Sequence, residues 1–442
     1  MSKILLIYPP INALVPAKST LLGLGYLASV LRNKGHEVIM KDLCLSNPEI
    51  TFKFNVIPDV VGISSMFTEY KLNVFDMINA FKKWLPNTIQ YIVGGAHAST
   101  FPEEMIEYAD TVVVGEGEEV ICDIVENRRK GIIIAERIRN LDNLPMPAWD
   151  LMMPDIKEMN RLSRKSPFLM RQPLVHIITS RGCPNNCTFC SVKVQWGRQW
   201  IARSAKNVVD EIEYLYRRGY REIHFNDDNC SVDRGRMYGI CDEILQRALK
   251  VKIACPTGIH IGTLDKPLLK QMKKVGFYRL CFGIETGNQE MQVKIKKNIN
   301  LDKAQQVIKD ANDLGFWTSA TFINHFPFAT REVTAENLLF AYNSELDFPI
   351  FYTLNIQPKT EIAEELKRLN IEFTTDNFGK GTIDYFYQKF IGWTIKNPFT
   401  IIKLIKKIHS FEDLRYALGL IWFALTKIIF KKAITNETVR GR

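Results

Sequence analysis

The 442-residue chain lacks several features that would place it in a common class of protein. In its C-terminal segment the longest run without a charged residue, Tyr416 to Thr426, has eleven residues, whereas about twenty are needed to cross a bilayer. The start of the sequence, Met1-Ser-Lys-Ile, has no signal-peptide pattern and leads directly into a strand-like run. We therefore expect no transmembrane helix and no disulfide framework of the secreted type.

Net positive charge is small outside the C-terminal segment. The net charge is +10, but residues 396–442 hold ten Lys and Arg against three Asp and Glu, which gives +7 and leaves +3 for the rest of the chain. A nearly balanced body does not favour nucleic-acid binding, despite a pI near 9. We expect no nucleic-acid partner.

Cysteine is also infrequent, but three of the nine cysteines lie together. Cys183, Cys187 and Cys190 have the spacing C-x3-C-x2-C within the stretch Arg181 to Cys190. Three thiolates on one short loop suit an iron–sulfur cluster, and a four-iron cluster held by three cysteines keeps one iron open to a small molecule. The other six cysteines are expected to be small buried apolar residues in a reducing cytoplasm.

Zinc, a disulfide or three unrelated thiols are the alternatives for this loop. A structural zinc site usually has four protein ligands in two pairs, and no second C-x2-C follows. The apolar run Leu174 to Thr179 predicts a buried strand before the loop, and Phe189 is expected to shield one face of a cluster. The pattern favours the cluster.

The first third of the chain alternates strand-like runs with helical patterns, which predicts a doubly wound α/β domain. The strand-like runs are residues 3–8, 38–41, 60–64, 91–93 and 111–114, and the helical patterns are residues 19–34, 70–84, 101–109 and 117–128. In such sheets a ligand lies at the carboxyl ends of the strands. The candidate binding residues there are Ser64, Thr68, Gly94, Gly95, His97, Gly115, Glu116, Gly117 and Glu118. Each glycine taken alone is more often only a turn residue.

The middle of the chain repeats strand and helix six times, which predicts a partial (β/α)6 barrel with its site at the carboxyl ends of the strands. Candidate residues at those ends are Asp227, Asp228, Gly283, Glu285 and Gly287. An aspartate in this position can also merely cap a turn. The expected domains are residues 1–135, a linker at 136–170, the barrel at 171–360, and a lid with basic helices at 361–442.

The cysteine loop resembles the signature of the radical S-adenosylmethionine (radical SAM) superfamily, and Gly283-Ile-Glu-Thr-Gly287 is similar to that family's Gly-Ile-Glu-Ser-Gly segment. Residues 3–150 resemble the cobalamin-binding domain that precedes many of these enzymes, through the segments Gly94-Gly-Ala-His97 and Gly115-Glu-Gly-Glu118 and the linker Leu141 to Trp149. The resemblance implies a 4Fe-4S cluster that reductively cleaves S-adenosylmethionine to a 5′-deoxyadenosyl radical. It also implies that Asp227 and Asp228 hold the ammonium group of S-adenosylmethionine, that cobalamin binds, and that a flavodoxin- or ferredoxin-like protein donates electrons.

The sequence departs from the family at several positions. The Asp-x-His-x-x-Gly motif that supplies a cobalt ligand is missing, and His97 is interpreted as structural rather than as that ligand. His260 stands where relatives usually have Arg, and Asn324 to Thr330 replaces a Gly-x-Pro-Gly-Glu-Thr segment. The lysines at 294, 296 and 297 are interpreted as a solvated helix face.

The resemblance favours cobalamin-dependent methylation of an unactivated carbon. Radical cyclisation or rearrangement without methyl transfer is the alternative, and a non-catalytic electron-transfer scaffold is the alternative from another class. The lysine-edged apolar helices after residue 396 suit either peripheral contact with the inner membrane surface or packing on the barrel. Membrane contact would favour a hydrophobic or lipid-like small-molecule substrate in an otherwise cytoplasmic enzyme.

Overall fold

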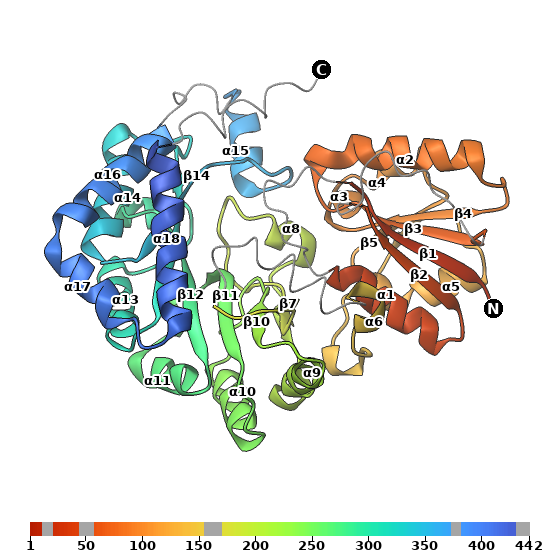
Figure 1. Cartoon of the computed structure of the whole chain (residues 1–442). Coiled ribbons are helices and arrows are strands. Elements are labelled where there is room, and N and C mark those ends of the chain that lie inside the picture. Colours follow the sequence, from red (N-terminus) through yellow and green to blue (C-terminus); the bar gives the residue numbers. More distant parts are fainter. Residues whose placement is uncertain (11–20, 44–56, 154–169, 373–381, 430–442) are drawn as a thin grey trace. The chain divides into compact units, whose positions relative to one another are not determined.

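The computed structural model describes residues 1–10, 21–43, 57–153, 170–372 and 382–429. The chain forms two compact units (Figure 1). The first comprises Met1–Lys165 and Val192–Arg203, and the second comprises Ser166–Ser191 and Ser204–Arg442.

The first unit is built on a parallel sheet with the strand order β2-β1-β3-β4-β5-β6. The order reverses next to β1, which confirms the predicted doubly wound fold. The strands are β1 (Lys3–Tyr8), β2 (Glu37–Asp42), β3 (Val60–Ser64), β4 (Gln90–Gly94), β5 (Thr111–Val114) and β6 (Gly131–Ile134). The edge strand β6 was not predicted: it has four residues, and both Ile132 and Ile134 are exposed.

Helices and 3-10 turns connect these strands. They are α1 (Leu22–Asn33), η1 (Thr68–Tyr70), α2 (Lys71–Trp84), α3 (Ala96–Thr100), α4 (Pro102–Met105), η2 (Gly117–Glu119), α5 (Ile121–Glu126), η3 (Leu141–Asn143) and α6 (Trp149–Met152). Helix α8 (Val192–Trp196), which follows the cysteine loop in sequence, also belongs to the first unit. Within that unit the guanidinium of Arg137 lies 4.6 Å from the ring of Trp196.

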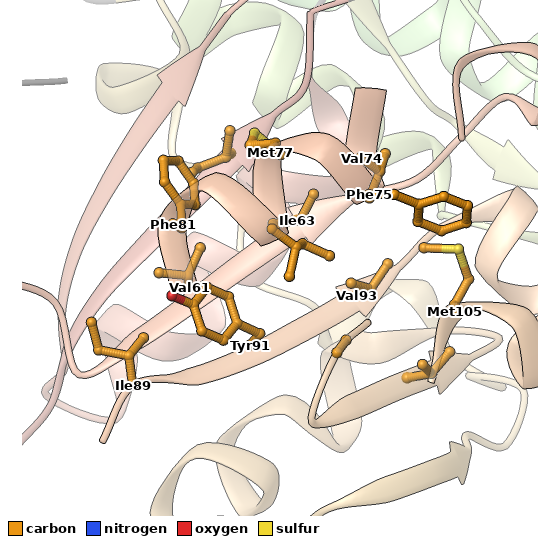
Figure 2. Packing of buried hydrophobic residues seen from close by; sticks show 14 of the residues in the cluster. Val61, Ile63, Val74, Phe75, Met77, Phe81, Ile89, Tyr91, Val93 and Met105 are labelled. Carbon is orange, nitrogen blue, oxygen red and sulfur yellow. The ribbon is translucent and has the colours of Figure 1, made fainter. Parts of the chain in front are cut away.

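The core of the first unit forms where one face of α2 packs on the sheet (Figure 2). Val74, Ile78 and Phe81 recur at helical spacing and are buried against Val61 and Val93 of the strands. Because α2 packs against β3 and β4 here, the core holds the carboxyl ends of both strands in place.

The second unit contains six parallel strands in the order β14-β13-β12-β11-β10-β7. They are β7 (Leu174–Ile177), β10 (Glu222–Phe225), β11 (Lys252–Ile259), β12 (Phe277–Glu285), β13 (Trp317–Asn324) and β14 (Phe348–Thr353). Each strand of this sheet pairs with the sheet strand that comes before or after it along the chain. This order is expected for a partial barrel rather than for a doubly wound sheet. The connecting helices are α9 (Ala205–Arg217), α10 (Arg234–Gln246), η4 (Ile261–Thr263), α11 (Lys266–Lys274), α12 (Gln289–Lys294), α13 (Leu301–Asp313) and α14 (Arg331–Asn343).

Four helices end the described chain: α15 (Glu361–Arg368), α16 (Thr382–Lys396), α17 (Pro398–Lys406) and α18 (Phe411–Ile429). Helix α18 buries Tyr416 and Ala417 against Tyr278 and Trp317, near the start of strands β12 and β13. Buried Lys407 joins Asp347 in an ion pair of 2.6 Å. Packing on the barrel, one of the two alternatives for this segment, is therefore correct for one face of the helices.

The other face of α17 and α18 is apolar and exposed. We call it the outer stripe, and it consists of Ile402, Ile405, Phe411, Leu414, Leu418, Ile421 and Trp422. In the part of the chain that the structure describes, no helix is both long and apolar enough to span a membrane.

Candidate functional site

The cysteine loop begins where β7 ends, and two aspartates hold its first residues. The carboxylate of Asp227, just after β10, accepts hydrogen bonds from Thr179 N (2.8 Å), Thr179 Oγ1 (2.5 Å) and Ser180 Oγ (2.5 Å). Asp228 Oδ2 accepts a bond of 2.9 Å from Gly182 N, immediately before Cys183. The acidic pair therefore fixes the approach to the cysteines.

The two aspartates differ in their exposure to solvent. Asp227 is buried, burial raises the pKa of its carboxyl group, and both of its oxygens already accept hydrogen bonds. Asp228 is exposed. The geometry gives Asp227 the turn-holding role that the sequence left open, and keeps Asp228 as the candidate for the ammonium group of S-adenosylmethionine.

The three cysteines are reduced, with Cys187 buried and Cys183 and Cys190 partly exposed. Burial raises the pKa of the Cys187 thiol. Among the described residues, no three His, Cys, Asp or Glu side chains are arranged to hold a metal ion. Three thiols on one loop are nevertheless the donor set of a site-open iron–sulfur cluster. Phe189 packs beside Phe326, with ring centroids 5.8 Å apart, and supplies the expected apolar cover next to Cys190.

Glu285 and Lys297 form a partly buried ion pair near this loop. Glu285, the last residue of β12, has φ of +68°, and its Oε1 lies 3.4 Å from Lys297 Nζ. A Cβ atom at Gly283 would lie 3.0 Å from both of these atoms, so a larger residue there would crowd the pair. Gly287 is required for packing, because a Cβ there would lie 2.5 Å from the carbonyl oxygen of Glu336.

The interpretation of Lys297 as part of a solvated face was wrong, since its side chain is only 11% exposed. Lys296 beside it is 45% exposed and pairs with Glu361. Lys294 lies over the ring of Phe328. Nothing in the local pattern separates the three lysines, because only the fold decides which of them turns inward.

The departures from the family have structural consequences. Burial, with the nearby charge of Lys297, lowers the pKa of His260 to about 4, so this residue is neutral near pH 7. His260 Nδ1 is buried and has no hydrogen-bond partner in the described chain. His325 has φ of +63°, a left-handed conformation that glycine adopts more readily than other residues.

In the first unit, glycines allow strand ends to approach each other. Gly95 has φ of +114°, and a Cβ there would lie 2.6 Å from Ser65 O. At Gly115, with φ of +92°, it would lie 3.0 Å from Ala135 O. Gly94 has no such crowding, and a Cβ at Gly117 would be 3.3 Å from Leu27.

The acidic candidate residues of this unit are buried within the fold. Glu116 is buried and pairs with Arg137 at 2.6 Å, and its Oε2 accepts a bond of 2.8 Å from Ile138 N. Glu118 is buried, and Ser64 is partly buried. The contacts of Glu116 join the end of β5 to the segment after β6.

His97 is enclosed at the same edge. Its Nδ1 lies 3.2 Å from Thr68 Oγ1, its ring is 5.2 Å from that of Phe101, and burial lowers its pKa. This environment favours the structural role over cobalt ligation. Met66 and Phe67, which follow Ser65 after the end of β3, are 41% and 46% exposed and add apolar surface at this edge.

Two family models match the chain. The Radical SAM superfamily model matches residues 177–341, and the B12 binding domain model matches residues 10–125. The chain belongs to the cobalamin-binding radical SAM enzymes. Its cofactors are accordingly a 4Fe-4S cluster, S-adenosylmethionine and cobalamin.

Several curated relatives of this radical SAM enzyme are methyltransferases by name. An uncharacterized methyltransferase of Pyrococcus horikoshii is 29% identical over 86% of this chain and 87% of its own length. The cytidylyl-2-hydroxyethylphosphonate methyltransferase of Streptomyces wedmorensis is 29% identical over 69% of each chain. The hopanoid C-3 methylase of Methylococcus capsulatus is 26% identical over 68% of this chain and 60% of its own.

Among solved structures, the fold is similar to that of the radical SAM methyltransferase TsrM from Kitasatospora setae, determined with cobalamin and a 4Fe-4S cluster bound. The TM-score is 0.68 at 17% identity, over 84% of this chain and 78% of that one. At this identity the likeness concerns the fold alone.

Proposed function

We propose that this enzyme transfers a methyl group to an unactivated carbon in a cobalamin-dependent reaction. The observation that carries the proposal is the cysteine loop with the partly buried Glu285–Lys297 pair beside it, in a chain that also contains a B12-binding domain. When bound, the cluster and S-adenosylmethionine supply a radical that removes a hydrogen atom, and cobalamin supplies the methyl group.

The side chains of the second unit have distinct tasks in this proposal. Asp227 holds the start of the cysteine loop, while Asp228 and Glu285 are the acceptors for the ammonium and ribose groups of S-adenosylmethionine. Phe189 and Phe326 keep water from the cluster side of the site. The protein thus binds, orients and shields, while the cofactors supply the reactive groups.

The outer stripe supports the proposed substrate class. Trp422 is 63% exposed, Ile405 62% and Leu418 56%, and all belong to the segment that holds seven of the ten net positive charges. The opposite face is fixed to the barrel through Tyr416 and Lys407, so the stripe cannot turn inward without breaking buried contacts. An apolar face with basic residues around it suits an anionic membrane surface. We therefore propose peripheral contact with the inner membrane surface and a hydrophobic or lipid-like substrate.

Reduction of the cluster requires an electron donor, and a flavodoxin- or ferredoxin-like protein is the proposed partner. No nucleic-acid partner is proposed, because the charge outside the C-terminal segment is nearly balanced.

Labelled methyl transfer tests the proposed function. The reconstituted enzyme would be incubated anaerobically with reductant, hydroxocobalamin and S-adenosylmethionine carrying a trideuterated methyl group, together with either a total lipid extract or a water-soluble extract of bacterial cells. We expect a trideuteromethylated product in the lipid extract that depends on cobalamin. A product of changed structure without the label would instead establish radical cyclisation or rearrangement, and a labelled product only in the soluble extract would refute the lipid-like substrate.

A further inference from the structure

Lys297 is tied to the cysteine loop by the backbone. Thr188, which follows Cys187, donates its N–H to Ile295 O at 3.0 Å. Lys297 lies two residues further along and donates its own N–H to Gln292 O at 3.0 Å. The segment that carries Lys297 is therefore held against the residues that surround Cys187.

Gln292 connects this segment to Glu285. Its side chain is fully buried, and Nε2 donates bonds of 2.8 Å to both Ile284 O and Thr286 O, the carbonyl groups on either side of Glu285. One glutamine thus fixes the backbone beside both members of the ion pair. Their positions are built into the fold rather than set by flexible side chains on a surface.

Both charges are placed where solvent screens them weakly. The side chains of Lys297 and Glu285 are 11% and 13% exposed. The ammonium of Lys297 lies 3.4 Å from the carboxylate of Glu285, and an opposite charge at this distance favours the charged form of both groups. A fixed charge in a poorly screened site acts strongly on any change of charge nearby.

We propose that Lys297 and Glu285 tune the reduction potential of the cluster in opposite directions. This inference rests on the proposed function, because it requires the cluster to bind at Cys183, Cys187 and Cys190. Each one-electron reduction adds one negative charge to the cluster, and nearby charge is one of the factors that set the potential of such clusters. Lys297 stabilises the reduced cluster and makes it easier to form. Glu285 opposes reduction and limits that effect.

Redox titration of the full reconstituted chain, followed by electron paramagnetic resonance, tests this proposal. The variants are Lys297→Met, Lys297→Arg and Glu285→Gln, and Lys296→Met removes a neighbouring exposed lysine as the matched control. We expect a more negative midpoint potential for Lys297→Met and a more positive one for Glu285→Gln. Lys297→Arg and Lys296→Met should match the unmodified chain.

Opposite shifts separate electrostatic tuning from general damage to the site, which would lower iron content in both variants. Shifts of the same sign at equal iron content, or no shift, would overturn the inference. If Lys297→Met does not take up iron, Lys297→Gln provides the same change of charge with a polar side chain. A midpoint potential of Lys297→Gln equal to that of the unmodified chain would also overturn the inference. Failure of the unmodified chain to form a four-iron cluster would instead refute the proposed function.

Discussion

The carboxylate of Asp227 and the hydroxyl of Ser180 are joined by a hydrogen bond of 2.5 Å, deep inside the second unit. Through this bond and those to Thr179, the end of β10 holds the start of the cysteine loop. A residue first considered as a ligand therefore acts on the cluster through the position of the loop.

Asp227→Asn tests this positioning role. An amide cannot accept all three bonds, and leaving buried donors unpaired costs about 1–3 kcal/mol. We expect lower stability and fewer irons per chain after anaerobic reconstitution, measured by chemical denaturation and iron analysis. Asp242→Asn, an exposed change on α10, is the control and should alter neither quantity. Full iron content in Asp227→Asn would show that the loop does not need this anchor.

The C-terminal helices should depend on the ion pair between Lys407 and Asp347. Both side chains are buried, with exposed fractions of 5% and 8%. Because Lys407→Met leaves Asp347 buried without its partner, the free energy of unfolding should fall by about 3–5 kcal/mol. Lys403→Met removes the exposed pair with Glu345 on the same surface, and should cost no more than about 1 kcal/mol. Equal losses of unfolding free energy in Lys407→Met and Lys403→Met, measured by urea denaturation, would contradict this ranking.

Membrane contact through the outer stripe can be measured by liposome flotation. The full chain should float with anionic vesicles and be released at high salt, because both apolar burial and attraction to headgroups contribute. Replacing Leu418, Ile421 and Trp422 by Ser should abolish flotation. Replacing Leu72 and Trp84 of α2, which are 63% and 66% exposed, should have no effect. Recovery of the full chain at the bottom of the gradient with anionic and neutral vesicles alike would refute membrane contact and the substrate class inferred from it.

Much of the fold could be predicted because the strands are buried apolar runs and their ends carry small or polar residues. The doubly wound sheet and the six parallel strands of the second unit both followed from that pattern. Strand β6 did not, because it is short and its Ile132 and Ile134 are exposed.

Less of the candidate site than of the fold could be predicted from the sequence. The burial of Lys297 depends on the contact between Thr188 and Ile295, which are more than one hundred residues apart. The role of Asp227 depends on donors from another strand end. The C-terminal helices have apolar residues on two faces, so their pattern alone could not separate packing from exposure.

The central claim is that Cys183, Cys187 and Cys190 hold a four-iron cluster that cleaves S-adenosylmethionine. The most direct test quantifies 5′-deoxyadenosine after anaerobic incubation of the reconstituted full chain with S-adenosylmethionine and dithionite, beside a variant in which all three cysteines are Ala. The account predicts about four irons and 5′-deoxyadenosine for the unmodified chain, and neither for the variant. Continued 5′-deoxyadenosine production by the variant would contradict it.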